Sequence, residues 1–158
     1  MTRAAGHTYY TYASEAGPFT LASDGAALVR FAFGCVAFDG ACAPSALTNR
    51  AATEVQQYLS GRRQVFDVPL RLEGTPFQKD VWAAIANIPY GQTRTYADVA
   101  ASAGHPGASR AVGQACNANP LAVFVPCHRV VGAHGRLGGY AFGPARKEFL
   151  LELEGARR

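Results

Sequence analysis

The chain has 158 residues, of which 49% are hydrophobic and 16% charged, so it has enough apolar sequence to bury a core and is neither disordered nor fibrous. The longest apolar stretch, residues 26–38, contains Arg30 and Gly34 and is too short to cross a bilayer, and residues 1–17 lack the apolar core of a signal peptide. We therefore expect a soluble, cytoplasmic protein that does not bind a membrane.

The net charge of +4 is unevenly distributed along the chain. Residues 1–73 carry six basic and six acidic side chains, whereas residues 74–158 carry nine and five. Residues 91–147 hold one acidic side chain, Asp98, against six basic ones: Arg94, Arg110, Arg129, Arg136, Arg146 and Lys147. Such a segment favours a polyanionic partner, although a solvated basic surface explains the charge balance equally well.

The first part of the chain predicts a small antiparallel sheet followed by one helix. Short segments rich in aromatic and β-branched residues, separated by turn sequences, predict strands at 9–12, 19–22 and 27–33. Apolar residues at helical spacing predict a helix over 47–59 that ends at Gly61, and a further strand is expected at 65–72.

The second part of the chain is predominantly helical in pattern. Thr75 at a cap position, followed by a proline and by Gln78 three residues after the cap, predicts a helix over 76–88. Two shorter helices are expected at 96–103 and 108–117, separated by a glycine-containing turn. Helix, tight turn and helix in this order form the helix-turn-helix pattern.

The helix expected at 108–117 has a polar face made by Arg110, Gln114 and Asn117 and an opposite face of small residues: Ala108, Ala111, Val112 and Ala115. The polar face suits contact with nucleic acid, and the small residues suit packing against the rest of the domain. An ordinary amphipathic surface helix is the alternative that the pattern alone favours, and the local basic excess weakens that alternative.

The remaining segments surround Cys127. A continuous apolar run predicts a short buried strand at 121–125, which would bring Cys127 and His128 to a basic surface. Residues 132–143 contain five glycines and predict a flexible loop, and residues 144–154 predict a closing helix.

Cys127 is either a buried packing thiol, the commonest state of a free cysteine, or a nucleophile. His128 is the obvious base, but neighbouring side chains on an extended segment point to opposite sides, so it reaches the thiol only through a bend or a bridging water. Glu154 is the candidate carboxylate to orient the imidazole of His128, with Glu152 as the alternative.

The four cysteines form no CxxC pair, and a chain of this length needs no disulfide framework, so we expect reduced thiols at Cys35, Cys42, Cys116 and Cys127. We expect no metal site, because the spacing of the nearby cysteines and histidines matches no zinc pattern: Cys116, Cys127, His128 and His134.

The sequence around Cys127 resembles that of the O6-alkylguanine-DNA alkyltransferases. The motifs that carry the resemblance are PCHRVV at 126–131, RAVG at 110–113, Asn119-Pro120, Gly139-Tyr140 and the closing segment 147–155. The similarity covers residues 74–155, whereas the first part matches only loosely, through a hairpin at 16–22. The resemblance implies an N-terminal α/β domain of ribonuclease-H-like fold at 1–73 and a mainly helical, winged helix-turn-helix domain at 74–158.

The resemblance also implies a reaction. Cys127 would accept the alkyl group of O6-alkylguanine, and possible O4-alkylthymine activity stays open. Each molecule would act once, because the thioether product has no leaving group that a thiol displaces. His128 would deprotonate Cys127 through a water, Glu154 would hold His128, and Asn119 would brace the active-site loop.

The partner implied is double-stranded DNA that contains O6-alkylguanine, bound by a monomer without a cofactor. Tyr96 would assist rotation of the nucleotide and donate a proton toward the departing guanine, and Arg110 would fill the gap in the stack, because the target base must leave the duplex. Further DNA contacts are expected from Gln114, Asn117 and Arg94. The substrate pocket would be lined by Val130, Tyr140 and Ala141.

Two positions depart from the family pattern. Ala141 stands where some relatives have a hydroxyl residue, so one hydrogen bond to O6 would be missing. Phe142 stands where glycine is usual, and its ring would either narrow the pocket for larger alkyl groups or point outward and change nothing. The alternative reading is a non-catalytic lesion-binding protein of the alkyltransferase-like kind, in which the cysteine is replaced. A transcription factor would leave the Cys-His-Glu set unexplained.

Overall fold

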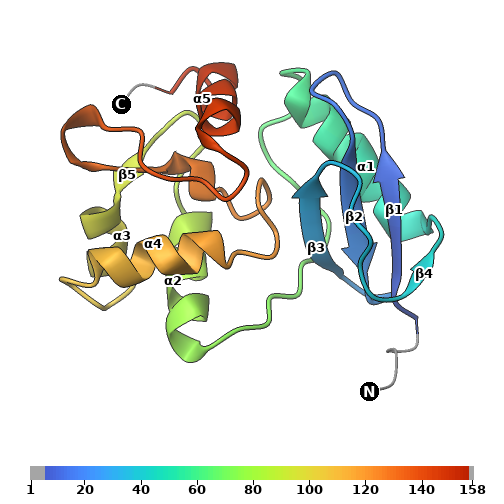
Figure 1. Ribbon diagram of the computed structural model, residues 1–158, viewed down its shortest axis with the longest axis horizontal. Helices are drawn as coiled ribbons and strands as arrows, with labels where there is room; N and C mark the ends of the chain where they lie inside the picture. Colours follow the sequence, from blue (N-terminus) through green and yellow to red (C-terminus); the bar gives the residue numbers. More distant parts are fainter. Residues whose placement is uncertain (1–5, 157–158) are drawn as a thin grey trace. The chain divides into compact units, whose positions relative to one another are not determined.

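The computed structural model describes residues 6–156, which form two compact units with their boundary between Leu72 and Glu73. Unit 1, on the N-terminal side of this boundary, is a sheet with one helix, and unit 2, on the C-terminal side, is mainly helical (Figure 1). No helix within residues 6–156 is long and apolar enough to cross a membrane.

Unit 1 contains a four-stranded sheet in the order β3-β2-β1-β4. The strands are β1 (Thr8–Tyr12), β2 (Phe19–Ser23), β3 (Leu28–Phe33) and β4 (Ala41–Cys42). The first three pair antiparallel, as the sequence predicts, and β4 adds a short parallel partner to β1 that the sequence analysis did not predict.

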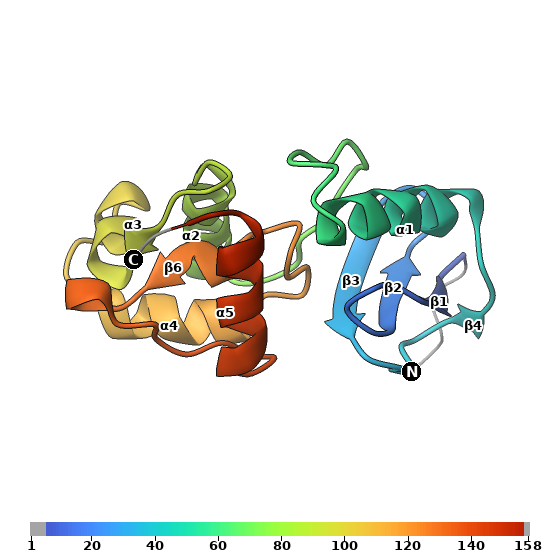
Figure 2. The same cartoon turned by 90° about the horizontal axis from the view of Figure 1, so that it is seen from above.

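Helix α1 (Ala46–Leu59) covers one face of this sheet (Figure 2). It begins at a capping box in which Ser45 accepts a hydrogen bond from the Thr48 amide. Ala51, Val55 and Tyr58 of its apolar stripe are fully buried, so the predicted amphipathic helix is confirmed.

The strand predicted at 65–72 is wrong. The segment makes a single bridge, in which Leu28 donates to the Pro69 carbonyl and accepts from the Arg71 amide. Pro69 has no amide hydrogen to continue a ladder, and Val65 is 67% exposed, so the segment runs as an extended loop.

Unit 2 begins with α2 (Pro76–Ala86), whose Thr75 cap accepts from the Gln78 amide as predicted; the helix ends two residues earlier than expected. It continues through β5 (Arg94–Thr95), α3 (Tyr96–Ser102), α4 (Ser109–Asn117), η1 (Cys127–Arg129), β6 (Val130–Val131), η2 (Ala133–Gly135) and α5 (Pro144–Leu153). Strands β5 and β6 pair in parallel. Helices α3 and α4 pack together, and the turn between them contains Gly104 and Gly107 at positive φ.

The buried strand predicted at 121–125 is also wrong, although the segment is buried throughout. It is a closed loop, in which the Val125 amide donates to the Leu121 carbonyl and Val123 adopts a φ of 76°. The Asn119 side chain holds both ends of this loop, because its Oδ1 accepts from the Leu121 amide and its Nδ2 donates to the Val125 carbonyl, at 2.9 Å each. The Asn119 side chain therefore satisfies backbone groups at both ends of the segment, which in a strand would pair with a neighbouring strand.

Candidate active site around Cys127

The loop closed by Asn119 delivers Cys127 to the interior of unit 2. Cys127 is 4% exposed and lies at the start of the 3-10 turn η1. Asn119 Nδ2, which holds the loop, also donates to Cys127 Sγ at 3.0 Å. A donor aimed at the sulfur favours its anionic form, so Asn119 both places and polarises the thiol.

His128 and Glu154 form a fully buried pair. Nε2 of His128 lies 2.8 Å from Oε2 of Glu154, and both side chains have no exposed surface. The predicted contact between these residues is therefore confirmed, whereas Glu152, the alternative carboxylate, is exposed. The expected extended segment is replaced by the turn η1, in which successive side chains are not on opposite sides.

The Glu154 carboxylate is held by more than His128. Arg129 donates to it twice, from Nε to Oε1 and from Nη2 to Oε2 at 2.9 Å each, and the Gly91 amide donates to Oε1 at 3.1 Å. Arg129 also donates to the Ile88 carbonyl at 2.7 Å. This bidentate ion pair keeps the buried Glu154 carboxylate charged. An unpaired carboxylate in the protein interior would instead become protonated.

These contacts define the protonation state of His128. Burial lowers its pKa, against the opposing effect of Glu154, so the imidazole is neutral near pH 7. A charged carboxylate only accepts hydrogen bonds, so the proton of the neutral ring is on Nε2. The other nitrogen, Nδ1, is buried and is the basic atom of the ring.

Lys147 is a second buried cation at the site, with no exposed side-chain surface. Its Nζ donates to the carbonyls of Val130 and Gly139, at 2.5 and 2.9 Å, and lies 5.7 Å from the centre of the Tyr96 ring. Arg129 and Lys147, which the charge pattern places in a basic segment, are both buried inside unit 2. Lys147 therefore connects the loop before α5, through Gly139, to strand β6, through Val130.

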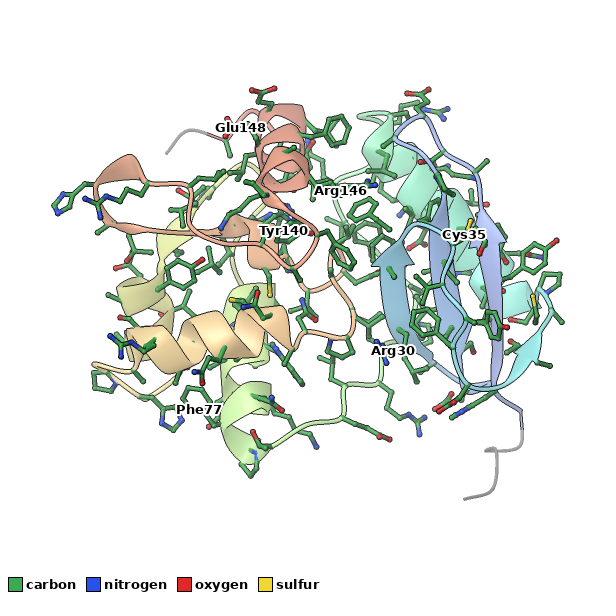
Figure 3. All side chains as sticks on the ribbon, in the orientation of Figure 1. Arg30, Cys35, Phe77, Tyr140, Arg146 and Glu148 are labelled. Carbon is green, nitrogen blue, oxygen red and sulfur yellow. The ribbon has the colours of Figure 1, made fainter. Side chains whose placement is uncertain are left out.

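The loop 132–143 passes directly over Tyr96. Gly138 has a φ of +77°, and a Cβ there would lie 2.7 Å from the Tyr96 hydroxyl oxygen, so glycine permits this approach. The Tyr96 hydroxyl donates to the Gly139 carbonyl at 3.4 Å. The buried hydroxyl of Tyr140 (Figure 3) has no hydrogen-bond partner within residues 6–156. Ala141 is exposed.

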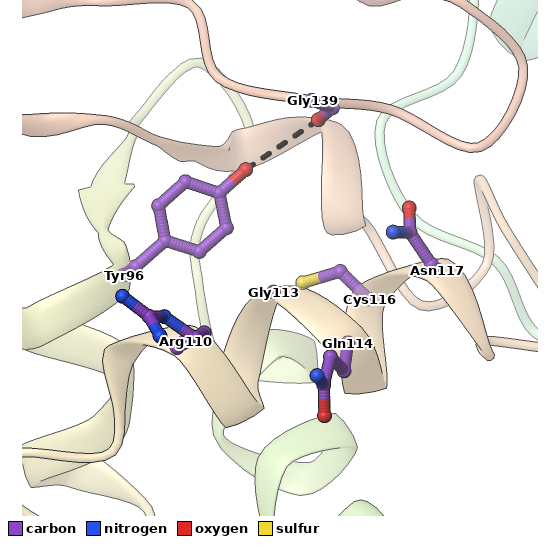
Figure 4. Close-up of a pocket in the computed structure, with 7 residues that line it drawn as sticks. All are labelled: Tyr96, Arg110, Gly113, Gln114, Cys116, Asn117 and Gly139. Atoms are coloured by element: carbon purple, nitrogen blue, oxygen red, sulfur yellow. Dashed lines mark hydrogen bonds between the residues drawn. The ribbon is translucent and has the colours of Figure 1, made fainter.

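A pocket of about 280 Å³ opens beside α4 (Figure 4). Its lining comes from α3, α4 and the glycine loop: Tyr96, Arg110, Gly113, Gln114, Cys116, Asn117 and Gly139. The polar face predicted for this helix is therefore confirmed and gathers with Tyr96, while Val112 and Ala115 on the other face are buried. Arg94 lines a different pocket, with Asn87 and Ser102 among others.

Cys116, to which the sequence assigns no role, lines the same pocket as Tyr96 and Arg110. The neighbouring Cys116 thiol and burial raise the pKa of Cys127 well above its ordinary value, and the hydrogen bond from Asn119 opposes the shift. Cys127 therefore needs a base to become a thiolate near neutral pH. Within the described part of the chain, no cluster of histidine, cysteine and acidic side chains is arranged to hold a metal ion.

Comparison with known proteins places both units in one family. Residues 76–156 match the family described as 6-O-methylguanine DNA methyltransferase, DNA binding domain, and residues 8–72 match the ribonuclease-like domain of the same proteins. The methylated-DNA–protein-cysteine methyltransferase of Methanosarcina acetivorans is 47% identical over 153 residues, which is 94% of this chain and 98% of that protein. The protein of the same name from Mycobacterium tuberculosis is 44% identical and covers 94% of this chain and 93% of its own length.

A solved structure agrees with these relatives. The crystal structure of Mycobacterium tuberculosis OGT in complex with DNA matches with a TM-score of 0.87 and 44% identity, over 94% of this chain and 92% of that one. The family matches together span most of the chain, and the full-length relatives exceed 40% identity. The chain therefore belongs to the family of methylated-DNA–protein-cysteine methyltransferases.

Proposed function

We propose that this chain repairs DNA by transferring the alkyl group of O6-alkylguanine to Sγ of its own Cys127, once per molecule. The observation that carries this proposal is a buried thiol, held by Asn119, beside a buried pair formed by His128 and Glu154. The relatives named above act on methylated DNA through a cysteine, according to their names. Because the cysteine is present here, the non-catalytic alternative is not favoured.

The proton of Cys127 passes to Nδ1 of His128 through one bridging water. The neutral ring accepts it there, and Glu154 stabilises the resulting imidazolium through Nε2. The thiolate then attacks the alkyl carbon, so that the S–C bond forms as the C–O6 bond breaks and the electron pair remains on the guanine oxygen. Arg129 prevents Glu154 from taking the proton, because it stabilises the charged carboxylate.

Tyr96 assists the departing guanine. Burial raises the pKa of its phenol, so the hydroxyl keeps its proton and is a donor near neutral pH. Its present acceptor is the Gly139 carbonyl at 3.4 Å, which is a long contact that a substrate atom can replace. The Tyr96 proton moves toward the guanine and leaves the base neutral.

DNA binds along α3 and α4, with α4 as the recognition helix of a winged helix-turn-helix and the loop 132–143 as its wing. The exposed side chains of Arg110, Gln114 and Asn117 meet the duplex, and Arg94 contributes from β5. Chemistry on O6 requires the nucleotide to leave the stack, and Arg110 occupies the space that it leaves. Double-stranded DNA with an O6-alkylated guanine is the proposed partner.

The flipped base enters beside Val130, Tyr140 and Ala141. The Val130 amide donates to the Cys127 carbonyl and its own carbonyl accepts from Lys147, so this backbone is rigidly held. The Tyr140 hydroxyl is a buried donor available to the base, whereas Ala141 offers no hydroxyl. Phe142 packs edge-on against Tyr140, with ring centres 5.8 Å apart, and narrows the pocket for larger alkyl groups.

Unit 1 has a ribonuclease-H-like fold, and the protein acts as a cytoplasmic monomer without a metal or soluble cofactor. A chelator should therefore leave the transfer rate unchanged. A rate that falls on chelation and returns with added metal would overturn this part of the proposal.

The test is intact-protein mass spectrometry after incubation with a duplex that bears one O6-methylguanine. We expect each molecule to gain one methyl group, mapped to the peptide that contains Cys127. An unmodified protein in excess lesion DNA would overturn the proposal. Methylation mapped to another cysteine would reassign the acceptor.

A further inference from the structure

Trp82 is a buried side chain of α2 whose indole nitrogen bonds to the backbone of α4. The residue is 1% exposed, and its Nε1–H donates to the Ala115 carbonyl at 2.9 Å where α2 packs against α4 (Figure 3). Gly74 lies directly against the ring, because a Cβ there would be 2.7 Å from two of the ring carbons. This close packing holds the indole in one orientation, with its single donor directed at α4.

The carbonyl that Trp82 binds belongs to a buried residue in the last turn of α4. A helical carbonyl accepts from the amide four residues later, which for Ala115 is the amide of Asn119. The Asn119 amide donates instead to the Cys116 carbonyl at 3.3 Å, and α4 ends at Asn117. Since a buried carbonyl needs a partner, the Trp82 indole supplies the donor that a longer helix would have supplied.

The end of α4 decides where the Asn119 side chain lies. Outside the helix, this side chain closes the loop before Cys127 through two backbone hydrogen bonds and donates to Cys127 Sγ at 3.0 Å. If the Asn119 amide bound the Ala115 carbonyl, the backbone of Asn119 would become helical and its side chain would turn away from these partners. The Trp82 hydrogen bond and the Asn119 contacts therefore form one connected arrangement that runs from α2 through α4 to the thiol.

We propose that Trp82 is a positioning residue for alkyl transfer, whose indole N–H sets the end of α4 and so directs Asn119 to the Cys127 thiol. Its effect on repair rests on the proposed function, whereas its effect on the thiol does not. Without the indole donor, the buried Ala115 carbonyl takes the Asn119 amide as its partner, and Nδ2 leaves the sulfur. Because the Asn119 hydrogen bond lowers the pKa of Cys127, the thiol then ionises less readily.

The experiment removes one hydrogen-bond donor from the full-length protein. Trp82 is the single tryptophan of the chain, so replacing tryptophan with an analogue in a tryptophan auxotroph changes this position alone. Benzothienylalanine keeps the shape of the ring but has sulfur in place of the N–H. The matched control is a ring-fluorinated tryptophan that keeps the N–H and carries the fluorine away from Gly74, and Trp82→Phe is a second variant without the donor.

The readout is the rate at which iodoacetamide labels Cys127, followed over a range of pH and separated from the other cysteines by peptide digestion. All proteins are compared at a temperature at which urea denaturation shows them to be folded. Cys116 and Lys147, which also act on the pKa of Cys127, are the same in every protein. A change in the pH profile therefore reports on Asn119 rather than on overall stability.

We expect the benzothienyl protein to label Cys127 about tenfold more slowly than the parent near neutral pH, the factor expected for one lost hydrogen bond to a thiolate. Its rate profile should move to higher pH, and alkyl transfer from a duplex with O6-methylguanine should slow in parallel. Trp82→Phe should behave in the same way, and the fluorinated control should match the parent. In an Asn119→Ala background the benzothienyl analogue should cause no further slowing, because Trp82 acts through Asn119.

Equal labelling rates in the benzothienyl protein and the fluorinated control would overturn the inference. The same slowing by the analogue with and without Asn119 would also overturn it, because Trp82 would then act by another route. A protein that accepts the methyl group but labels Cys127 at the parental rate without the indole donor contradicts this inference alone. A protein with the expected labelling that never accepts an alkyl group contradicts the proposed function alone.

Discussion

Unit 1 buries the side chain of Glu54 and unit 2 buries that of Glu154, with side-chain exposures of 6% and 0%. Glu54 accepts from the Asp67 amide at 2.9 Å, and the nearest cation, on Arg63, is 3.8 Å away and partly exposed. Glu154 accepts from His128, twice from Arg129 and from the Gly91 amide.

The comparison shows how the same residue type serves two purposes. Glu54 ties the chain after α1 back to the helix, which is a structural task that a neutral acceptor also performs. Glu154 has a buried guanidinium to keep it charged and a buried imidazole to orient, which is the arrangement that general-base catalysis needs. Burial alone does not mark a catalytic carboxylate, whereas the identity and charge of its partners do.

The largest effect is expected from Cys127→Ser, which removes the acceptor from unit 2 and leaves its hydrogen-bonding partners in place. A serine hydroxyl is far less acidic than a thiol, so transfer should be lost while DNA affinity is retained. Single-turnover transfer and a binding titration on the same duplex measure the two properties. Residual transfer at the parental rate would show that another group accepts the alkyl chain.

Replacing Arg129 tests whether its buried ion pair with Glu154 stabilises unit 2 more than a surface ion pair stabilises unit 1. Arg129→Met leaves Glu154 charged and buried without its ion-pair partner, and should cost roughly 3–5 kcal/mol of unfolding free energy. The matched change in unit 1, Arg71→Met, breaks a pair whose arginine is 52% exposed and should cost less than about 1 kcal/mol.

Urea denaturation measures both changes. Trp82 is the single tryptophan of the chain, is 1% exposed and reports on unit 2 through its fluorescence. The buried Tyr58 reports on unit 1 through near-ultraviolet circular dichroism. Equal costs for the two variants would mean that the Arg129 pair is no more important to the fold than a surface ion pair.

Arg110→Ala should separate base flipping from chemistry. The variant keeps the reactive thiol but lacks the side chain that stands in for the extruded base, so flipping becomes costlier by a few kcal/mol at most, on the order expected for unstacking. Transfer should slow strongly on duplex DNA and little on free O6-alkylguanine, which needs no flipping. An equal defect on both substrates would make Arg110 a structural residue.

The smallest effect is a pH dependence of stability. The folded-state pKa of His128 lies below its unfolded value of about 6.5, so the unfolded chain binds more protons in mildly acidic solution. The contribution of His128 to stability should therefore be complete above about pH 6.5 and be lost as the pH falls through the lowered pKa. Urea midpoints followed by Trp82 fluorescence test this, with His128→Gln as the control, in which the decline should be reduced.

The sequence was sufficient to predict the features that depend on residues close together in the chain. The Thr75 cap, the glycine turn between α3 and α4 and the polar face of α4 were predictable because each depends on residues a few positions apart. The pair of His128 and Glu154 was predictable as a hypothesis because the family resemblance supplied its long-range contact.

The errors arose where a distant side chain decides the structure. The apolar run before Pro126 looks like a strand, but Asn119 closes it into a loop. Arg129 and Lys147 look like surface cations, and only the folded chain brings them to Glu154 and to the carbonyls of Val130 and Gly139. Sequence spacing does not reveal such contacts between residues far apart in the chain.

The most direct test of the account compares the single-turnover transfer rates of Glu154→Gln and Glu54→Gln, at a temperature at which both variants are folded. Glu154→Gln should slow transfer by about tenfold or more, because a neutral amide stabilises the imidazolium of His128 much less than a carboxylate does, while leaving DNA affinity nearly unchanged. Glu54→Gln should transfer at the parental rate, because the amide oxygen still accepts from Asp67. Parental transfer by Glu154→Gln, or equal slowing by both variants, would contradict the assignment of Glu154 to the chemistry of Cys127.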